Sequence, residues 1–114
     1  MNTSRYQECI DACDACARAC DECASACLSE DDVGMFAACI RLDLDCAATC
    51  RVAAGLMARE STFVTEFCAL CAGVCAACAA ECSNHEAGHC QRCAEACNRC
   101  AQACRDMAAG PAAG

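Results

Sequence analysis

The cysteines of this 114-residue chain recur in steps of three and four residues, and this spacing constrains the fold more than any other feature. Positions three and four apart lie on one face of an α-helix, so each regular run predicts a helix with a row of thiols along one side. We call these rows cysteine stripes. Three complete cysteine stripes are formed by Cys9, Cys13, Cys16, Cys20, Cys23 and Cys27; by Cys68, Cys71, Cys75, Cys78 and Cys82; and by Cys90, Cys93, Cys97, Cys100 and Cys104. A weaker stripe at Cys39, Cys46 and Cys50 has Asp43 at its missing step.

These stripes predict an all-α protein of four helices. The expected helices are 4–28, 33–58, one that follows a cap at Ser61 or Thr62 and runs through Cys82, and one near 83–107. The last helix opens either at a capping box of Ser83 and Glu86 or one turn later at Gly88. Connections this short force neighbours to be antiparallel, which gives an up-down-up-down four-helix bundle with a cysteine-lined core. We expect one domain, 1–107, and a flexible C-terminal tail, 108–114.

Composition narrows the class of protein further. The chain has three Phe, one Tyr and no Trp, so the sulfurs themselves must fill much of the interior. The formal net charge is -8 and the basic residues are scattered, which argues against nucleic-acid binding. The chain shows neither an N-terminal secretory signal nor an uninterrupted apolar run of about 18 residues. We therefore expect a soluble cytoplasmic protein without a membrane partner.

Two ordinary roles of cysteine account poorly for the stripes. A buried cysteine acts as a small hydrophobe at one or two positions of many proteins, but this chain has 19. Disulfides within a stripe are disfavoured because neighbours on a helix have Cβ atoms about 5–6 Å apart, whereas a disulfide needs about 3.5–4.5 Å. The odd number of cysteines also argues against a stapled scaffold, although disulfides between helices stay open.

Metal binding is the remaining role, and thiolate-only surroundings select the soft ions Cu(I), Zn(II) or iron with sulfide. Zn(II) favours four ligands in a tetrahedron, usually supplied by loops, and the chain lacks the C-x2-C-x2-C-x3-C run of cluster ferredoxins. Cu(I) accepts two or three sulfurs, so an i,i+4 pair already supplies a site. Bridging sulfurs would also keep the core near neutral at about one Cu(I) per cysteine, whereas each isolated zinc tetrathiolate carries excess negative charge. The stripes therefore favour copper.

The cysteine-lined arrangement, with C-x-x-x-C and C-x-x-C steps along every helix, resembles the cytosolic branch of the bacterial copper storage proteins. The resemblance covers Ser4 to Met107. It implies a four-helix bundle that holds many Cu(I) ions per chain in its core, with the 19 cysteines as ligands, and that assembles as a homotetramer. The second helix departs from the pattern, with Asp43 and Ala53 at stripe positions.

Other residues are expected at the two ends of the bundle. One end gathers thiols with His85, His89 and Met35, and we expect it to be a mouth where these three side chains receive Cu(I). Phe63 and Val64 are expected to plug the opposite end, which also gathers Tyr6, Met107 and Met57, the last as core filler. Asp43 is either a ligand or hydrogen-bond partner of thiols in the core, or, after a small rotation that buries Leu42, a solvated side chain.

The sequence thus predicts a protein that stores and buffers Cu(I) and has no enzymatic activity. A nucleophilic cysteine needs a positioned base, and both histidines lie in one segment beside no unique thiol. A copper chaperone is a candidate exchange partner. Two alternatives stay open: a zinc or mixed-metal thiolate reservoir, and a cytosolic thiol–disulfide redox buffer.

Overall fold

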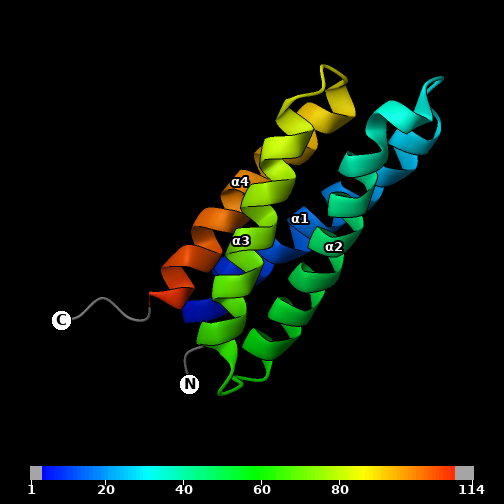
Figure 1. The fold of residues 1–114 in the computed structure, drawn as a ribbon. Coiled ribbons are helices and arrows are strands. Elements are labelled where there is room, and N and C mark those ends of the chain that lie inside the picture. Colours follow the sequence, from blue (N-terminus) through cyan, green and yellow to red (C-terminus); the bar gives the residue numbers. More distant parts are fainter. Residues whose placement is uncertain (1–3, 110–114) are drawn as a thin grey trace.

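The chain folds into four long helices and one short 3-10 turn in a computed structural model that describes residues 4–109, with side chains described from residue 6. The elements are α1 (Ser4–Leu28), η1 (Val33–Phe36), α2 (Ala37–Ala58), α3 (Val64–Ser83) and α4 (Gly88–Ala108). Each helix packs on its two neighbours, α1 on α2 and α4, and α3 on α2 and α4. The helices lie along one another with the connections at the two ends (Figure 1), so the predicted antiparallel bundle is confirmed.

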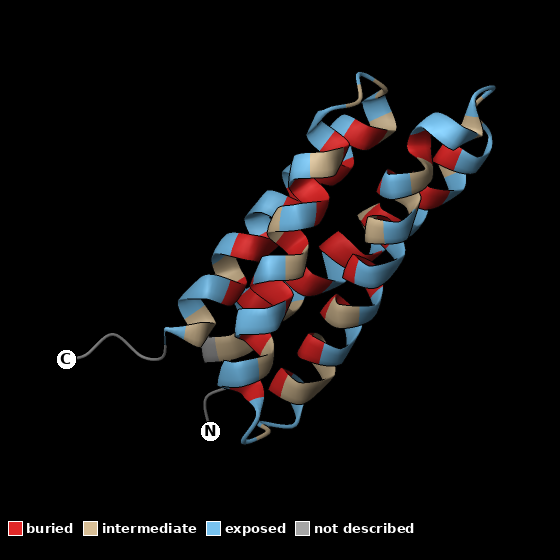
Figure 2. Ribbon diagram, viewed as in Figure 1, coloured by how far each residue is buried: buried red, intermediate tan, exposed pale blue. Residues whose placement is uncertain are grey.

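The cysteine stripes and the alanines beside them form the faces that meet inside the bundle. Buried positions recur along the inner side of all four helices (Figure 2). Small side chains let the helices approach closely, and alanine has the strongest intrinsic preference for helix. At position 53 of the α2 stripe, Ala53 is fully buried in place of a cysteine. The result is an elongated bundle of 50 × 22 × 18 Å.

The helix boundaries differ from the expected ones at two places. The segment Val33–Phe36 is a separate 3-10 turn, and Asp32 before it makes no side-chain cap. Ser83 ends α3 by donating its hydroxyl to the carbonyl of Ala80 at 2.9 Å, so the predicted capping box of Ser83 and Glu86 is wrong. The alternative start of α4 at Gly88 is confirmed.

The connection between α2 and α3 reverses the chain through a left-handed residue. Glu60 has φ 56°, and the Ser61 N–H returns to the carbonyl of Leu56 at 2.9 Å, which satisfies a carbonyl that the helix end leaves free. The Ser61 hydroxyl then accepts the Phe63 N–H at 3.0 Å, but Phe63 is itself the N-cap residue of α3 and no side chain among the described residues caps this helix. The expected cap at Ser61 or Thr62 is therefore wrong.

The plugged end is only partly as expected. Met57 and Val64 are buried, at 1% and 4% exposure, and Tyr6 and Met107 pack against the core. Phe63 is 63% exposed, so its expected role as a plug is wrong. Phe63 directly precedes the first turn of α3, and its side chain lies outside the packed faces. The predicted tail 108–114 lies mostly outside the described residues.

Among the described residues, α3 alone has the length and apolar character of a membrane-spanning helix, with mean hydropathy 1.5 over 18 residues. This is weak support for a membrane span, because a core helix of a soluble bundle has the same character. The buried stripe of α3, Cys68 to Cys82, packs into the bundle core.

Candidate metal centre

All 19 cysteines point into the core, and none is more than 3% exposed. All are free thiols in this structure. The row of thiols on each helix meets the rows on its neighbours, so the thiols form a continuous column inside the bundle, with buried alanines beside them. The predicted inward orientation of the four stripes is therefore confirmed.

The sulfur atoms of neighbouring helices lie at distances suited to sharing a metal ion. Cys16 Sγ is 3.6 Å from Cys46 Sγ, and Cys50 Sγ is 3.6 Å from Cys75 Sγ. Pairs on one helix are only slightly farther apart, as for Cys46 and Cys50 at 4.0 Å. Two sulfurs of a tetrahedral thiolate site with metal–sulfur bonds of about 2.3 Å lie roughly 3.8 Å apart. The spacing of the thiols is therefore close to the spacing of metal ligands.

The thiols form overlapping groups rather than separate sites. In each group the sulfurs all lie within 4.8 Å of one another, and one cysteine often belongs to two groups. Five of the groups are Cys13, Cys71, Cys100 and Cys104; Cys16, Cys46, Cys50 and Cys75; Cys16, Cys20, Cys46 and Cys97; Cys20, Cys78, Cys93 and Cys97; and Cys23, Cys27, Cys39 and Cys90. Sharing of Cys16, Cys20 and Cys46 between groups is the arrangement that bridging thiolates require.

Asp43 occupies the missing step of the α2 stripe and lies fully inside the core. Its Oδ1 accepts hydrogen bonds from the thiols of Cys78 at 3.2 Å and Cys93 at 3.3 Å, and from Cys82 at 3.5 Å. Of the two orientations open from the sequence, the structure has the one that buries Asp43, while Leu42 is half-buried. Burial, together with the charge of Cys93, raises the pKa of the Asp43 carboxyl to about 7.

His89 is the histidine that reaches the thiols at the mouth. Its Nδ1 lies 3.5 Å from Cys90 Sγ, 3.6 Å from Cys23 Sγ and 3.9 Å from Cys27 Sγ. Its Nε2 lies 2.8 Å from the carboxylate of Glu30 in the α1–η1 connection. A carboxylate only accepts hydrogen bonds, so a neutral His89 carries its proton on Nε2 and turns the lone pair of Nδ1 toward the sulfurs.

The other two side chains expected at the mouth lie farther from the thiols. His85 places Nε2 3.0 Å from the Glu81 carboxylate and stacks its ring on Phe36 at 4.8 Å between ring centroids. Met35 lies in η1 and is 64% exposed. The structure therefore brings His89 together with the core thiols. Met35 lies near this end on the surface, and His85 makes no contact with a thiol among the described residues.

Two residues that shape this end were missed from the sequence. Glu30 orients His89 although the two are 59 positions apart. Phe36 is buried and lies against both histidine rings, with 6.1 Å between its centroid and that of His89. No spacing pattern signals either residue, because both contacts depend on how the α1–α2 connection folds over the start of α4.

Burial also sets the protonation state of thiols near the mouth. Loss of solvent, with the nearby charge of Cys90, raises the pKa of Cys27 to about 11, and burial likewise raises the pKa of Cys39. These thiols are therefore protonated at neutral pH in the metal-free protein. A cation that binds them must displace their protons, so binding and proton release are coupled.

Comparisons with known proteins agree with this geometry. Residues 2–109 match the family described as copper storage protein. The chain is 48% identical, over 71 residues, to a cysteine-rich protein of Bacillus subtilis, YhjQ, and the match covers 61% of this chain and 66% of that protein, just under two thirds.

Solved structures of copper storage proteins superpose on nearly the whole bundle. A Cu(I)-bound copper storage protein, BsCsp3, is 46% identical with TM-score 0.88, covering 91% of this chain and 98% of that one. A cytosolic copper storage protein from Streptomyces lividans, with five coppers, is 41% identical with TM-score 0.92, covering 96% and 97%. In sequence, in fold and in its column of buried thiols, the chain belongs to the copper storage protein family.

Proposed function

We propose that this chain stores and buffers many Cu(I) ions in the bundle core, with the thiolates of its 19 cysteines as the ligands. The observation that carries the proposal is the overlap of the buried thiol groups, in which Cys16, Cys20 and Cys46 each serve two groups. Such sharing suits metal ions that are linked by bridging sulfurs along a column. The copper-bound relatives with the same fold support the choice of metal.

Charge favours Cu(I) over Zn(II) in this core. The net charge of the chain is already -8, and the core contains no Lys or Arg among the described buried residues. Four thiolates around one Zn(II) leave two excess negative charges, which a buried site can hold only at a cost of several kcal/mol unless they are neutralised. At about one Cu(I) per cysteine, each ion replaces one thiol proton, so bridging sulfurs keep the filled column near neutral.

Asp43 and the mouth have separate parts in this proposal. Asp43 accepts hydrogen bonds from the thiols of Cys78, Cys82 and Cys93. When copper binds these sulfurs, the carboxylate either becomes a further ligand or accepts a proton that a thiol loses. His89 supplies the first nitrogen ligand at the mouth, because its Nδ1 already lies near three thiols. His85 and Met35 remain predicted outer ligands.

No catalytic role is proposed. Nucleophilic catalysis needs one thiol activated by one oriented base, whereas His89 Nδ1 lies within 4 Å of three thiols that are equally buried. Storage requires only that copper exchange between such thiols. We expect the protein to act in the cytoplasm and to exchange copper with a chaperone.

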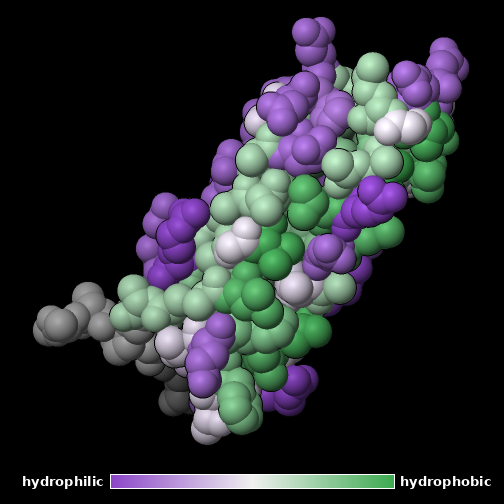
Figure 3. Space-filling model, in the orientation of Figure 1, coloured by the Kyte–Doolittle hydropathy of each residue, from purple (hydrophilic) through white to green (hydrophobic). Residues whose placement is uncertain are grey.

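We further propose that the protein assembles as a homotetramer through the outer faces of α2 and α3. Hydrophobic side chains gather over these two helices on the face shown in Figure 3. Leu44 and Val52 of α2 and Leu70 of α3 are 54%, 47% and 54% exposed. Burial of such a face against a second copy would remove apolar surface from water. Sedimentation of the reduced protein measures the oligomeric state directly.

The test of storage is an anaerobic titration of the reduced, metal-free protein with Cu(I) in competition with a chromophoric chelator. We expect tight binding to an end point of about one copper per cysteine, with the helices retained. An end point of a few ions, or displacement of copper by zinc at half that ratio, would point to the zinc reservoir. Reversible disulfides between helices in protein isolated from cells would point to the redox buffer.

A further inference from the structure

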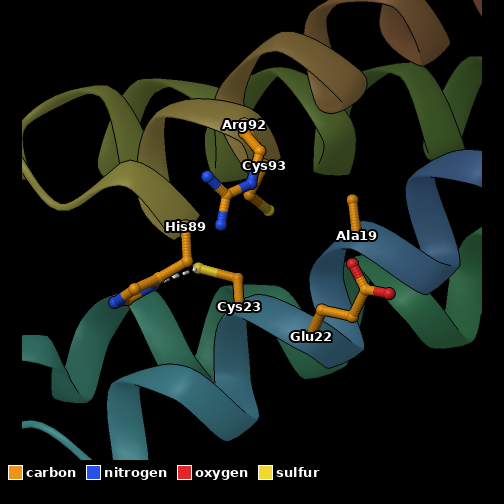
Figure 4. Close-up of a pocket in the computed structure, with 6 residues that line it drawn as sticks. All are labelled: Ala19, Glu22, Cys23, His89, Arg92 and Cys93. Carbon is orange, nitrogen blue, oxygen red and sulfur yellow. Dashed lines mark hydrogen bonds between the residues drawn. The ribbon is translucent and has the colours of Figure 1, made fainter.

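A small pocket opens into the thiol column through the side of the bundle, between α1 and α4 (Figure 4). It encloses about 80 Å³. The pocket is lined by Ala19, Glu22, Cys23, His89, Arg92 and Cys93. Cys23 and Cys93 are each one helical turn deeper than the thiols at the mouth, and each is only 1% exposed. The pocket therefore gives a lateral approach to core sulfurs beside the mouth, with His89 common to both.

The rim of the pocket carries two charged groups of opposite sign on opposite helices. Glu22 projects from α1 and Arg92 from α4, with the opening between them (Figure 4). Neither side chain has an ion-pair or hydrogen-bond partner within residues 4–109, and they do not pair with each other. Arg92 folds back over the first turn of α4, where its Nη1 lies 3.2 Å from the position that a Cβ on Gly88 would take. The guanidinium therefore lies at the rim with its donors free.

The floor of the pocket has the chemistry to take copper from a carrier. Cys93 Sγ lies 3.8 Å from Cys20 Sγ and 3.3 Å from Asp43 Oδ1, so an ion received here is already in contact with the column. Cys23 Sγ lies 3.6 Å from His89 Nδ1 and 3.9 Å from Cys90 Sγ, which links the same place to the mouth. The pocket, with a volume of about 80 Å³, has room for a metal ion and a few of the atoms that carry it.

We propose that this pocket is an exchange site for Cu(I) carried by a small thiol that bears both a carboxylate and an ammonium group. The guanidinium of Arg92 binds the carboxylate, a geometry that arginine favours, and Glu22 receives the ammonium group. These contacts place the carrier sulfur and its copper over Cys23 and Cys93. The inference rests on the proposed storage function and adds to it the place and the partner of exchange.

The transfer is a ligand exchange without oxidation or reduction. The thiol of Cys23 attacks the copper of a bis-thiolate carrier complex, a sulfur–copper bond forms, and one carrier sulfur leaves with the proton that Cys23 loses. Cys93 then displaces the second carrier sulfur in the same way. One Cu(I) bis-thiolate and two protein thiols become one protein-bound Cu(I) bis-thiolate and two free carrier thiols, so atoms and charge balance.

The experiment compares copper transfer to the whole reduced protein from two donors, Cu(I) with L-cysteine and Cu(I) with 2-mercaptoethanol, which lacks the charged groups. Rapid desalting under anaerobic conditions followed by metal analysis gives protein-bound copper against time. Arg92→Gln should slow transfer from the cysteine donor about threefold, the size expected for an exposed charge pair, and leave transfer from mercaptoethanol at the wild-type rate. Arg99→Gln is the matched control, because Arg99 is exposed on α4 two turns away and lines no part of the pocket.

A second pair of variants tests the opening itself. Ala19→Leu should narrow the pocket and slow transfer from the cysteine donor, whereas Ala15→Leu, one turn earlier on the exposed side of α1, should not. Circular dichroism shows whether each variant is folded. Equal slowing of both donors by Arg92→Gln, or the same effect from Arg99→Gln, would overturn the proposal.

The final amount of copper separates this proposal from the storage function. If the wild-type protein stops at a few ions, storage itself fails, whatever the rates. If it fills to about one copper per cysteine but the variants transfer at wild-type rates from both donors, storage stands and the lateral exchange site is wrong.

Discussion

The carboxylate of Asp43 on α2 accepts a hydrogen bond from the thiol of Cys78 on α3, with 3.2 Å between Oδ1 and Sγ. Asp43 is fully buried, and among the described residues it is the one buried side chain that can carry a carboxylate charge. A buried carboxyl held only by thiols is poorly solvated when ionised, so it retains its proton to higher pH than it would in water. This relationship ties the stability of the metal-free core to pH.

The metal-free protein should lose stability as the pH rises from about 4 to about 7. Burial raises the folded-state pKa of Asp43 to about 7 from its ordinary value of 3.8, so the folded state binds the proton more tightly than the unfolded chain in this window. A shift of this size is worth up to about 4 kcal/mol, at about 1.4 kcal/mol per pH unit. Denaturant unfolding of the reduced protein at pH 5 and pH 7 measures it. Asp43→Asn should flatten the pH dependence of the free energy of unfolding, whereas Asp45→Asn, on the exposed side of α2, should leave it as in the wild type. An unchanged pH dependence in Asp43→Asn would show that Asp43 is not its source.

The two histidines at the mouth should differ in their effect on copper uptake. His89→Ala removes a nitrogen that lies within 4 Å of three thiols, and should slow uptake from a chelator several-fold. His85→Ala removes a ring that pairs with Glu81 and stacks on Phe36, and should change the rate by less than about twofold. Stopped-flow measurement of chelator release tests the pair. Equal rates of copper uptake in the two variants would show that His89 has no special part in receiving copper.

The two methionines near opposite ends should differ in their contribution to stability. Met57 is 1% exposed in the core, and Met57→Ala should destabilise the metal-free protein by about 2–4 kcal/mol through the cavity it leaves. Met35 is 64% exposed, and Met35→Ala should change stability by less than about 0.5 kcal/mol. Urea unfolding measures both. A small effect at Met57 combined with a lost copper site would make it a ligand rather than core filler.

The regular spacing of cysteine allowed the fold to be predicted well. Steps of three and four residues fix which face of each helix is buried, and short connections fix the antiparallel order. The spacing also marked Asp43 as an irregular position, but the choice between burying Asp43 and burying Leu42 needed the packing of α2 against α3 and α4. Helix ends were less predictable because one or two hydrogen bonds decide them, as at Ser83.

Features between helices had no signal in the sequence. The contact of Glu30 with His89 and the pocket between Glu22 and Arg92 join residues far apart in the chain. Such contacts depend on the rotation and spacing of neighbouring helices, which periodicity leaves undetermined. The spacing pattern also could not predict that Phe63 is exposed, because the turn at Glu60 sets its position just outside α3.

Removal of copper should leave the bundle folded. The packed faces of the four helices bury every cysteine, and no buried side-chain nitrogen or oxygen in the described residues lacks a hydrogen-bond partner within the protein. Copper that binds only the folded state should still raise the midpoint of thermal unfolding, because binding to the folded state adds to its stability.

Circular dichroism of the reduced protein before and after extraction of copper by a strong chelator measures both effects. We expect the helical signal to be retained and the unfolding midpoint to fall. Loss of the helical signal in fully reduced protein would mean that the metal builds the fold, as in zinc fingers. A store must be able to empty without unfolding, because an unfolded chain would expose its thiols to oxidation and to other metals before it could be refilled.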